Sequence, residues 1–479
     1  MGVFIFSCGF WLFTGIICKG TDDRFARGVK EEGWKQVGNG RMLVRFPPDK
    51  KAAPMSIKAY KYRISANKTT TDNLDRVLNL CRELYNAGLQ ERRDAYETRV
   101  KRHPNYYDEA SRKHLTKEHA ISVYEQKRDL VEIKEVIRPE YLDIASHVLQ
   151  DVLFRLEKAY KRFFQRVKNG EQPGYPRFQG RTRYTSFTYP DGAGWKLDAV
   201  TRPPDKKGMV QVKLHLSKLG TVSLHLHRDI TGAIKTLTMK REGEHWYAVL
   251  SCEIGNPDAL PVSDEDVGID LGVTHFAALS NGEFLEAPRH YRRTEKKLKK
   301  LQEALSRKKR GSHRRARAVK RVASAHRKIR HQRRDFAHKA SRQLTNRYQV
   351  VVLEKLQTAN LTRRPKPKQH EESGQYLPNG ASAKSGLNKS INDAGWGLFT
   401  ELLQVKAAWA GREVVFVNPY NTSQMCSGCG TEVKKDLSER WHSCECGCEL
   451  DRDTNAAKNI LTLGQKALLG GTRPTRATA

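Results

Sequence analysis

The sequence predicts a multidomain α/β protein. Apolar residues recur at helical spacing between residues 72 and 168. Residues 210–253 instead alternate between apolar and polar side chains, the pattern of an antiparallel sheet. Two apolar runs further on, 266–279 and 350–353, predict buried strands. At 479 residues, 38% of them hydrophobic, the chain is long enough for two or three domains with cores of their own.

Residues 1–54 do not fit these patterns. The apolar run 3–18 spans 16 residues and ends at Lys19, which is short for a transmembrane helix. It also lacks the charged leader and the cleavage site of a signal peptide. We interpret residues 1–54 as a non-homologous or mis-started extension, with a membrane tether as the alternative. The functional protein is expected to begin near Met55 and to show no stable membrane association.

From Met55 the expected elements follow in order. The alternating stretch 56–65 predicts a strand, residues 67–71 a polar turn, and Asp72 the cap of the first helix. Further helices are expected at 117–130 and 141–168. The strand at 56–65 is expected to pair with the strands of 210–253, so that the helical module is an insertion within one sheet.

Arginines and aromatic residues alternate directly after the helical module. Such a mixture is expected on a surface that neutralises phosphates and stacks on bases. The alternative is that the aromatic residues begin a β-sheet core. The candidate nucleic-acid-binding residues here are Arg177, Phe178, Arg181, Arg183 and Tyr184.

The charge of the chain points to a polyanionic partner. It has 87 Lys and Arg against 53 Asp and Glu, a formal net charge of +34. Nucleic acid is the expected partner, because the basic residues are spread over the chain and not gathered into one cluster facing a membrane. They are densest at 289–334, with 21 Lys or Arg and two Glu.

The basic segment 289–334 predicts a pair of long helices with one face docked and the others exposed to the polyanion; a merely solvated surface is the alternative. Its candidate binding residues are Lys308, Lys309, Arg310, Arg314 and Arg315. The following segment, 363–390, predicts a mobile loop, either a lid or a linker.

Three acidic residues are candidates for one shared cation site. Asp270 and Glu354 lie in or at the end of buried strands, and Asp453 starts the last helix, with Asp451 as its alternative. A buried carboxylate is normally paired with arginine or bound to a metal. Carboxylates from two strands and a helix form the arrangement that holds two Mg²⁺ ions for in-line attack on a phosphodiester. Singly, an Asp that begins a helix is more often a cap.

Five cysteines gather within 23 residues near the C-terminal end. Cys426 and Cys429 form a C-x-x-C pair, and Cys444 and Cys446 form a shorter C-x-C pair, with Cys448 or His442 as substitutes. Four thiolates are the ligands of a structural zinc ion. Disulfides are disfavoured, because the four other cysteines are scattered along the chain.

Several of these runs resemble TnpB, the family of RNA-guided nucleases of insertion-sequence transposons related to type V CRISPR effectors. They are GIDLGVTHFAALSNG, VVLEKL, the stretch 387–430 and RDTNAAKNIL, and the resemblance covers about residues 55–465. It implies a RuvC-like (RNase H-type) nuclease domain with a zinc-ribbon insertion, preceded by a wedge β-barrel that holds a helical recognition domain. Carried over to this chain, the catalytic residues are Asp270, Glu354 and Asp453. The chain departs from the family in the short Cys444-x-Cys446 pair and in residues 1–54, which match nothing there.

The resemblance implies a cytoplasmic RNA-guided DNA endonuclease, found with the nucleoid when bound to DNA. A structured guide RNA and double-stranded target DNA are the implied partners, and two Mg²⁺ and one Zn²⁺ the implied metals. The alternatives are a compact type V CRISPR effector, a nuclease-silent RNA-guided repressor and a DNA transposase. The expected parts are the extension 1–54, the first barrel strand 55–71, the helical recognition domain 72–176, the rest of the barrel 177–262, the first nuclease part 263–425, the zinc ribbon 426–448 and the nuclease end 449–479.

Overall fold

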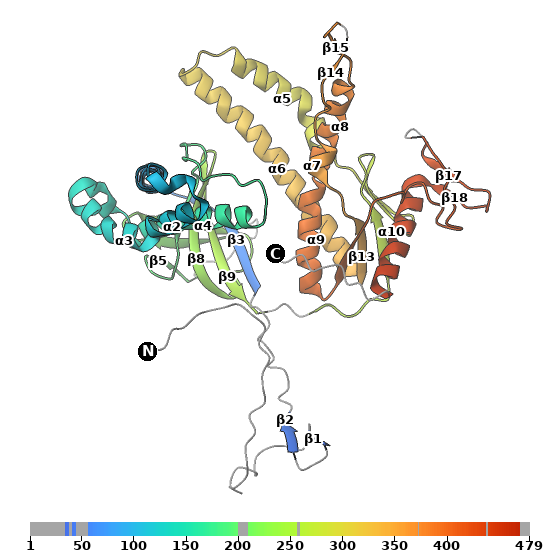
Figure 1. The fold of residues 1–479 in the computed structure, drawn as a ribbon, viewed down its shortest axis with the longest axis horizontal. Coiled ribbons are helices and arrows are strands. Elements are labelled where there is room, and N and C mark those ends of the chain that lie inside the picture. Colours follow the sequence, from blue (N-terminus) through green and yellow to red (C-terminus); the bar gives the residue numbers. More distant parts are fainter. Residues whose placement is uncertain are drawn as a thin grey trace. The chain divides into compact units, whose positions relative to one another are not determined.

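The computed structural model describes residues 34–37, 41–44, 56–199, 209–255, 259–371, 373–436 and 439–469 (Figure 1). The chain divides into two units, Met1–Pro54 and Met55–Ala479. In the first, β1 (Trp34–Val37) and β2 (Arg41–Val44) form an antiparallel pair. The apolar run 3–18 lies outside the described residues. Within the described ranges, no helix combines the length and the apolar character that crossing a membrane requires.

A seven-stranded antiparallel sheet forms the first part of the second unit. Its strand order is β4-β8-β9-β3-β7-β6-β5. Strand β3 (Ser56–Ser65) pairs with β9 and β7, which confirms the predicted pairing of distant segments. The other strands are β4 (Ser186–Tyr189), β5 (Trp195–Leu197), β6 (Val210–Leu216), β7 (Gly220–Leu226), β8 (Ala233–Glu242) and β9 (His245–Ile254).

Four α-helices lie in the connection between β3 and β4, as expected of an insertion. They are α1 (Lys68–Ala95), α2 (Glu109–Glu118), α3 (Val123–Glu132) and α4 (Ser146–Lys168), joined by the short turns η1 (Tyr96–Lys101), η2 (Pro104–Tyr107), η3 (Ile133–Ile137) and η4 (Pro139–Asp143). The prediction of Asp72 as the cap of the first helix was wrong. Asn67 caps it, because its side-chain oxygen accepts from the Thr70 amide at 2.7 Å, so the helix begins where a polar turn was expected.

A five-stranded sheet forms the second part, in the order β12-β11-β10-β13-β16. Its strands are β10 (Asp266–Asp270), β11 (His275–Leu279), β12 (Phe284–Glu286), β13 (Val350–Glu354) and β16 (Glu413–Val417). Strands β13 and β16 run parallel to β10, whereas β11 and β12 return antiparallel. The single strand predicted at 266–279 is therefore a pair of strands, and the chain reverses between Asp270 and His275.

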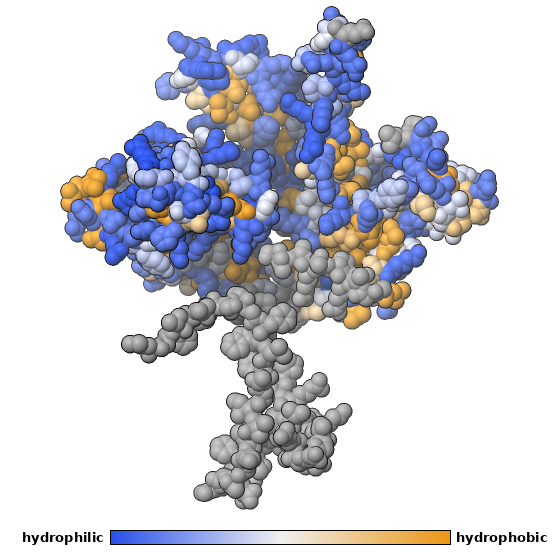
Figure 2. Space-filling view, viewed as in Figure 1, coloured by the Kyte–Doolittle hydropathy of each residue, from blue (hydrophilic) through white to orange (hydrophobic). Residues whose placement is uncertain are grey.

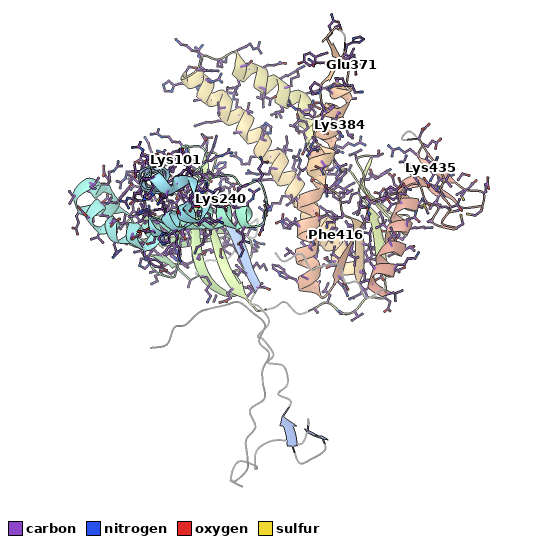
Figure 3. The ribbon with its side chains drawn as sticks, viewed as in Figure 1. Lys101, Lys240, Glu371, Lys384, Phe416 and Lys435 are labelled. Carbon is purple, nitrogen blue, oxygen red and sulfur yellow. The ribbon has the colours of Figure 1, made fainter. Side chains whose placement is uncertain are left out.

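Helices cover both faces of this sheet, with β13 drawn between α9 and α10 in Figure 1. Val351 and Leu353 pack in one core with α6 and α9, and Val352 packs in another with α10, since neighbouring residues of a strand point to opposite faces. Phe416 of β16, marked in Figure 3, adds to the first core. The helices are α5 (His290–Ser306), α6 (His313–Arg347), α7 (Thr358–Leu361), α8 (Ala381–Ala394), α9 (Trp396–Ala410) and α10 (Arg452–Leu469).

The basic segment forms the predicted pair of long helices, α5 and α6, and α6 continues past residue 334 to Arg347. Hydrophilic side chains cover much of the face seen in Figure 2. The segment 363–390, predicted as a loop, contains structure of its own. It holds the two-stranded hairpin of β14 (Lys368–Gln369) and β15 (Tyr376–Leu377) and most of α8.

Candidate active site

The three predicted acidic residues line one cavity at an edge of the five-stranded sheet. Asp270 ends β10 and Glu354 ends β13, and the carboxyl ends of these parallel neighbours meet at the same edge. Asp453 lies in the first turn of α10. The cavity has a volume of about 320 Å³, and its other lining residues are Pro419, Thr422, Ser423, Arg440, Arg452 and Ala456.

Two glycines allow α10 to approach the sheet closely enough to bring Asp453 there. A Cβ atom on Gly268 of β10 would lie 2.1 Å from the Ala457 carbonyl oxygen of α10. On the helix side, a Cβ on Gly464 would lie 2.4 Å from a methyl carbon of Val352. Both contacts are far shorter than van der Waals contact allows, so only glycine fits at either position.

The structure separates the roles of Asp451 and Asp453. The Asp451 carboxylate accepts from the backbone amides of Asp453 at 2.9 Å and Thr454 at 3.1 Å, which makes it the N-terminal cap of α10. Asp453 caps nothing and faces the cavity, where Arg440 lies 3.9 Å from its carboxylate. The arrangement therefore favours Asp453 over Asp451 as the functional acid.

Burial raises the pKa of all three carboxyl groups. Burial, together with the charges of Glu354 and Asp453, raises the pKa of Asp270 to about 8. Burial also raises the pKa of Glu354, and burial and then the nearby Asp451 raise that of Asp453. Three partly buried acids, of which Asp270 is further affected by the charges of the other two, are a fitting donor set for divalent cations, whose charge would stabilise the ionised carboxylates.

Sequence reasoning missed Thr422, which is almost fully buried beside the acids. Its hydroxyl donates to a carboxylate oxygen of Glu354 and so fixes that side chain. Arg440 and Arg452, also missed, bring positive charge to the same cavity. Thr422 could have been considered because it lies close in sequence to the Cys426 pair. Arg440 lies in a stretch without a recognisable motif.

The cysteine cluster has the geometry of a zinc site. The sulfur atoms of Cys426, Cys429, Cys444 and Cys446 all lie within 4.8 Å of one another. Cys426 and Cys446 are 3.7 Å apart, and Cys429 and Cys444 are 3.6 Å apart. Tetrahedral zinc with bonds of about 2.3 Å places its sulfur ligands about 3.8 Å apart. The four residues therefore fit the ion.

A second set that shares Cys426 contains His442 and Cys448. The Nε2 atom of His442 is buried and has no hydrogen-bond partner, while its Nδ1 atom contacts Lys435, marked in Figure 3. Cys444, Cys446 and Cys448 all lie in the turn between β17 (Trp441–Ser443) and β18 (Glu449–Asp451). The compact turn brings three thiols to one place, which is why the sequence left the choice between them open.

Hydrogen bonds join the cysteine cluster to the helix that carries Asp453. The buried side chain of Asn455 donates to the Met425 carbonyl at 2.7 Å and accepts from the Ser427 amide at 2.9 Å. Asn459 donates to the carbonyls of Thr422 and Met425. The turn that holds Cys426 is thus fixed to the first two turns of α10.

The residues predicted to contact nucleic acid after the helical module differ in their exposure. Arg177, Phe178, Arg181 and Arg183 are exposed. Tyr184 was predicted wrongly: it is 7% exposed and packs near Tyr85 in the core, so its ring cannot stack on a base. The alternative, that the aromatic residues begin a β-core, holds for Tyr184 and for its buried neighbours.

At the junction of the basic helices α5 and α6, four predicted contacts are exposed: Lys308, Lys309, Arg310 and Arg314. Arg315 is partly buried and donates to the Leu305 and Lys308 carbonyls, each at 3.0 Å, so it closes the turn between α5 and α6. Its prediction as a nucleic-acid contact is corrected accordingly.

Comparisons with known proteins agree with this arrangement. Residues 249–364 match the family OrfB_IS605, described as "Probable transposase"; residues 396–460 match the Cas12f1-like TNB domain, and residues 55–101 a helix-turn-helix domain of OrfB_IS605. The chain is 30% identical over 420 residues to "Putative RNA-guided DNA endonuclease InsQ" of Escherichia coli K12, covering 87% of this chain and 94% of the relative.

A relative from Streptomyces pristinaespiralis, "Putative RNA-guided DNA endonuclease", is 31% identical over 435 residues, covering 88% of this chain and 93% of the relative. A cryo-EM structure of a Cas12f1-sgRNA-target DNA complex covers 85% of this chain and 98% of that chain at 12% identity. The TM-score of this match is 0.49, and we draw no conclusion from it.

Proposed function

Because the chain belongs to the TnpB family of transposon-encoded proteins, we propose that it is an RNA-guided DNA endonuclease. The observation that carries the proposal is the convergence of Asp270, Glu354 and Asp453, from two strands and a helix, on one cavity. Two relatives matched over most of their length carry that activity in their names. A nuclease-silent repressor is disfavoured, because such a protein has no need of all three acids.

The nuclease domain would be RuvC-like, of the RNase H type. The mixed sheet, with three antiparallel strands followed by two parallel ones, supports this assignment. The seven-stranded sheet and its inserted helices would be the wedge and recognition domains. The domain limits proposed are those expected from the sequence, except that the helical part begins with α1 at Lys68 and not at residue 72.

Asp270, Glu354 and Asp453 would hold two Mg²⁺ ions. When bound, the ions activate the attacking water and stabilise the leaving oxygen. The residues of the chain prepare that site: Thr422 orients Glu354, and Asp451 starts the helix that presents Asp453. Arg440 and Arg452 line the cavity and supply positive charge for the scissile phosphate.

Cys426, Cys429, Cys444 and Cys446 would hold one structural zinc ion, with Cys448 as the alternative fourth ligand. Zinc bound there contributes folding free energy directly. Because Asn455 ties the Cys426 turn to α10, the zinc-bound cluster would stabilise the helix that carries Asp453.

The exposed basic residues would bind a structured guide RNA and the target DNA. Sequence specificity would then lie in base pairing between guide and target, while the protein recognises a short adjacent motif and the shape of the heteroduplex. A compact type V CRISPR effector would use the same chemistry; no observation in this chain favours it over a transposon-encoded enzyme.

The test is programmed cleavage. The RNA that co-purifies with the protein is sequenced, its guide segment is replaced, and a plasmid library carrying the new target beside randomised flanks is treated in Mg²⁺. Cleavage of the new target that EDTA abolishes is expected. If the protein carries no defined RNA, or cuts regardless of the guide, the proposal is wrong.

A further inference from the structure

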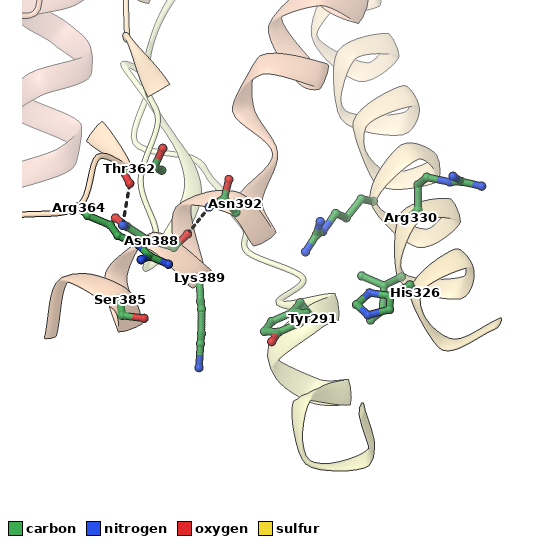
Figure 4. A pocket seen from close by; sticks show the side chains of 11 residues that line it. Tyr291, His326, Arg330, Thr362, Arg364, Ser385, Asn388, Lys389 and Asn392 are labelled. Atoms are coloured by element: carbon green, nitrogen blue, oxygen red, sulfur yellow. Dashed lines mark hydrogen bonds between the residues drawn. The ribbon is translucent and has the colours of Figure 1, made fainter. Parts of the chain in front are cut away.

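A second and larger cavity lies away from the three acids. Its volume is about 640 Å³, and it lies between α5, α6, α8 and the segment that follows α7 (Figure 4). The lining includes the basic side chains of Arg330, Arg333, Arg364 and Lys389, and it contains no carboxylate. Pockets of this size hold small organic ligands, and this one is suited to a ligand with negative charge.

Ion pairs already neutralise part of this positive charge. Arg333 pairs with the buried Asp393 at 2.9 Å, and Lys389 pairs with Glu295 at 2.8 Å. Arg364 is different, because no carboxylate of the described residues pairs with it. A guanidinium that lines a cavity without a partner is a ready donor to a phosphate.

Asn388 supplies a second unmet interaction. Its side-chain nitrogen donates to the Thr362 carbonyl at 2.8 Å (Figure 4), which fixes the orientation of the amide. The oxygen of the same amide is buried and has no hydrogen-bond partner. An unpaired buried acceptor costs about 1–3 kcal/mol, so a ligand that donates a hydrogen bond to the Asn388 oxygen would be favoured.

We propose that this cavity binds one ribonucleotide of the guide RNA. Arg364 and Lys389 hold its phosphate, the ribose 2′-hydroxyl donates to the Asn388 oxygen, and the rings of Tyr291 and His326 offer faces to the base. The free acceptor favours RNA over DNA, because deoxyribose lacks the 2′-hydroxyl donor. The inference rests on the proposed function and adds a defined RNA site to it.

Binding there would join elements that are far apart in the sequence. Arg364 belongs to the segment after α7, Lys389 to α8 and His326 to α6, and one nucleotide would contact all three. The segment 363–390, expected to be a lid or a linker, would then be held in place by RNA through Arg364.

The experiment compares two neighbouring arginines in the full-length protein. Arg364→Gln removes the unpaired cation of the cavity, whereas Arg363→Gln removes a neighbouring exposed charge that does not line it. Affinity for the transcribed guide RNA is measured over a range of salt concentrations. Arg364→Gln is expected to weaken binding roughly tenfold, as for a lost charge-assisted hydrogen bond. It should also reduce the slope of log K against log salt by about 0.7–0.9.

Arg363→Gln is expected to change the affinity much less. Lys389→Gln should weaken binding in the same direction as Arg364→Gln but by less, because Lys389 is already paired with Glu295. Equal effects of Arg363→Gln and Arg364→Gln in variants with wild-type melting temperatures would overturn the inference. Photo-crosslinking of complexes with guide RNA alone, and then with a target duplex, separates the two nucleic acids. A ribonucleotide adduct on the peptide of Tyr291 or His326 supports the site, and a deoxyribonucleotide adduct there overturns its assignment to RNA.

If the proposed function itself is wrong, these experiments give a different result from the one expected when only the cavity is assigned wrongly. In that case the wild-type protein shows no preference for the guide RNA over DNA of the same sequence, and the RNA-specific site is overturned with it. If wild-type protein prefers the guide RNA while Arg364→Gln and Lys389→Gln retain full affinity, only the cavity assignment is wrong.

Discussion

Replacing Gly268 by alanine should push α10 away from the sheet and strongly reduce cleavage. The added Cβ would lie 2.1 Å from the Ala457 carbonyl oxygen and 2.6 Å from the Leu461 amide nitrogen. Ordinary contact begins near 3.4 Å, so the helix backbone must move by about 1.3 Å. These neighbours are backbone atoms and cannot turn aside as a flexible side chain would.

This displacement would change the relative positions of the carboxylates that the proposed reaction requires. Asp270 belongs to the sheet and Asp453 to the moving helix, so their separation changes with it. A misplacement of about 1 Å costs on the order of 100-fold in rate, and the overpacked core loses about 1–3 kcal/mol of stability. We therefore expect cleavage to fall about 100-fold, with a lower melting temperature and nearly unchanged affinity for guide RNA.

The assay is single-turnover cleavage of target DNA by RNA-loaded protein, with thermal unfolding of the same samples. Gly397→Ala in α9 is the matched control, because its Cβ would meet nothing within 4 Å and alanine favours a helix. It should cleave normally and melt no lower than wild type. Normal cleavage and stability in Gly268→Ala would refute the close packing of α10 on β10.

Four further substitutions test the cysteine cluster, the acidic cavity and an ion-pair group on β8. Cys446→Ser should lower the zinc content from about one ion per chain and depress cleavage, whereas Cys448→Ser should be mild; the reverse order would make Cys448 the fourth ligand. Thr422→Val removes the hydroxyl that lowers the pKa of Glu354, so half-maximal cleavage should need a higher Mg²⁺ concentration. An unchanged Mg²⁺ dependence would mean that this hydrogen bond does not contribute to metal binding. Glu242→Gln weakens the contacts of a largely buried carboxylate with Lys61 and Arg330 and should lower stability by about 2 kcal/mol; a melting temperature equal to wild type would show that these ion pairs contribute nothing.

Patterns within a short stretch predicted much of the fold. The alternation at 56–65 and 210–253 predicted strands that do pair, and the charge density at 289–334 predicted the two long helices. Asp270 and Glu354 could be singled out because a carboxylate is conspicuous in an apolar strand. In each case the local sequence carried the physical cause.

The errors lie where the outcome depends on distant residues. Tyr184 is buried by contacts with residues such as Tyr85, about 100 positions away. Arg315 is drawn into a turn by two carbonyls of the preceding helix end. Four separate segments line the cavity around Arg364 and Asn388, so no single stretch of sequence could predict it. Asn67 and Asp72 are both good helix caps, and only the backbone path decides between them.

The comparison of Asp453 with Asp451 tests the proposed metal-dependent nuclease site most directly. Asparagine caps a helix about as well as aspartate, so Asp451→Asn should preserve α10 and much of the cleavage. Asp453→Asn should lose a metal ligand and fall by at least about 100-fold in single-turnover cleavage, with guide RNA still bound. If Asp453→Asn cuts at a rate near wild type, Asp453 does not hold the catalytic metal; with an inactive Asp451→Asn, that role passes to Asp451.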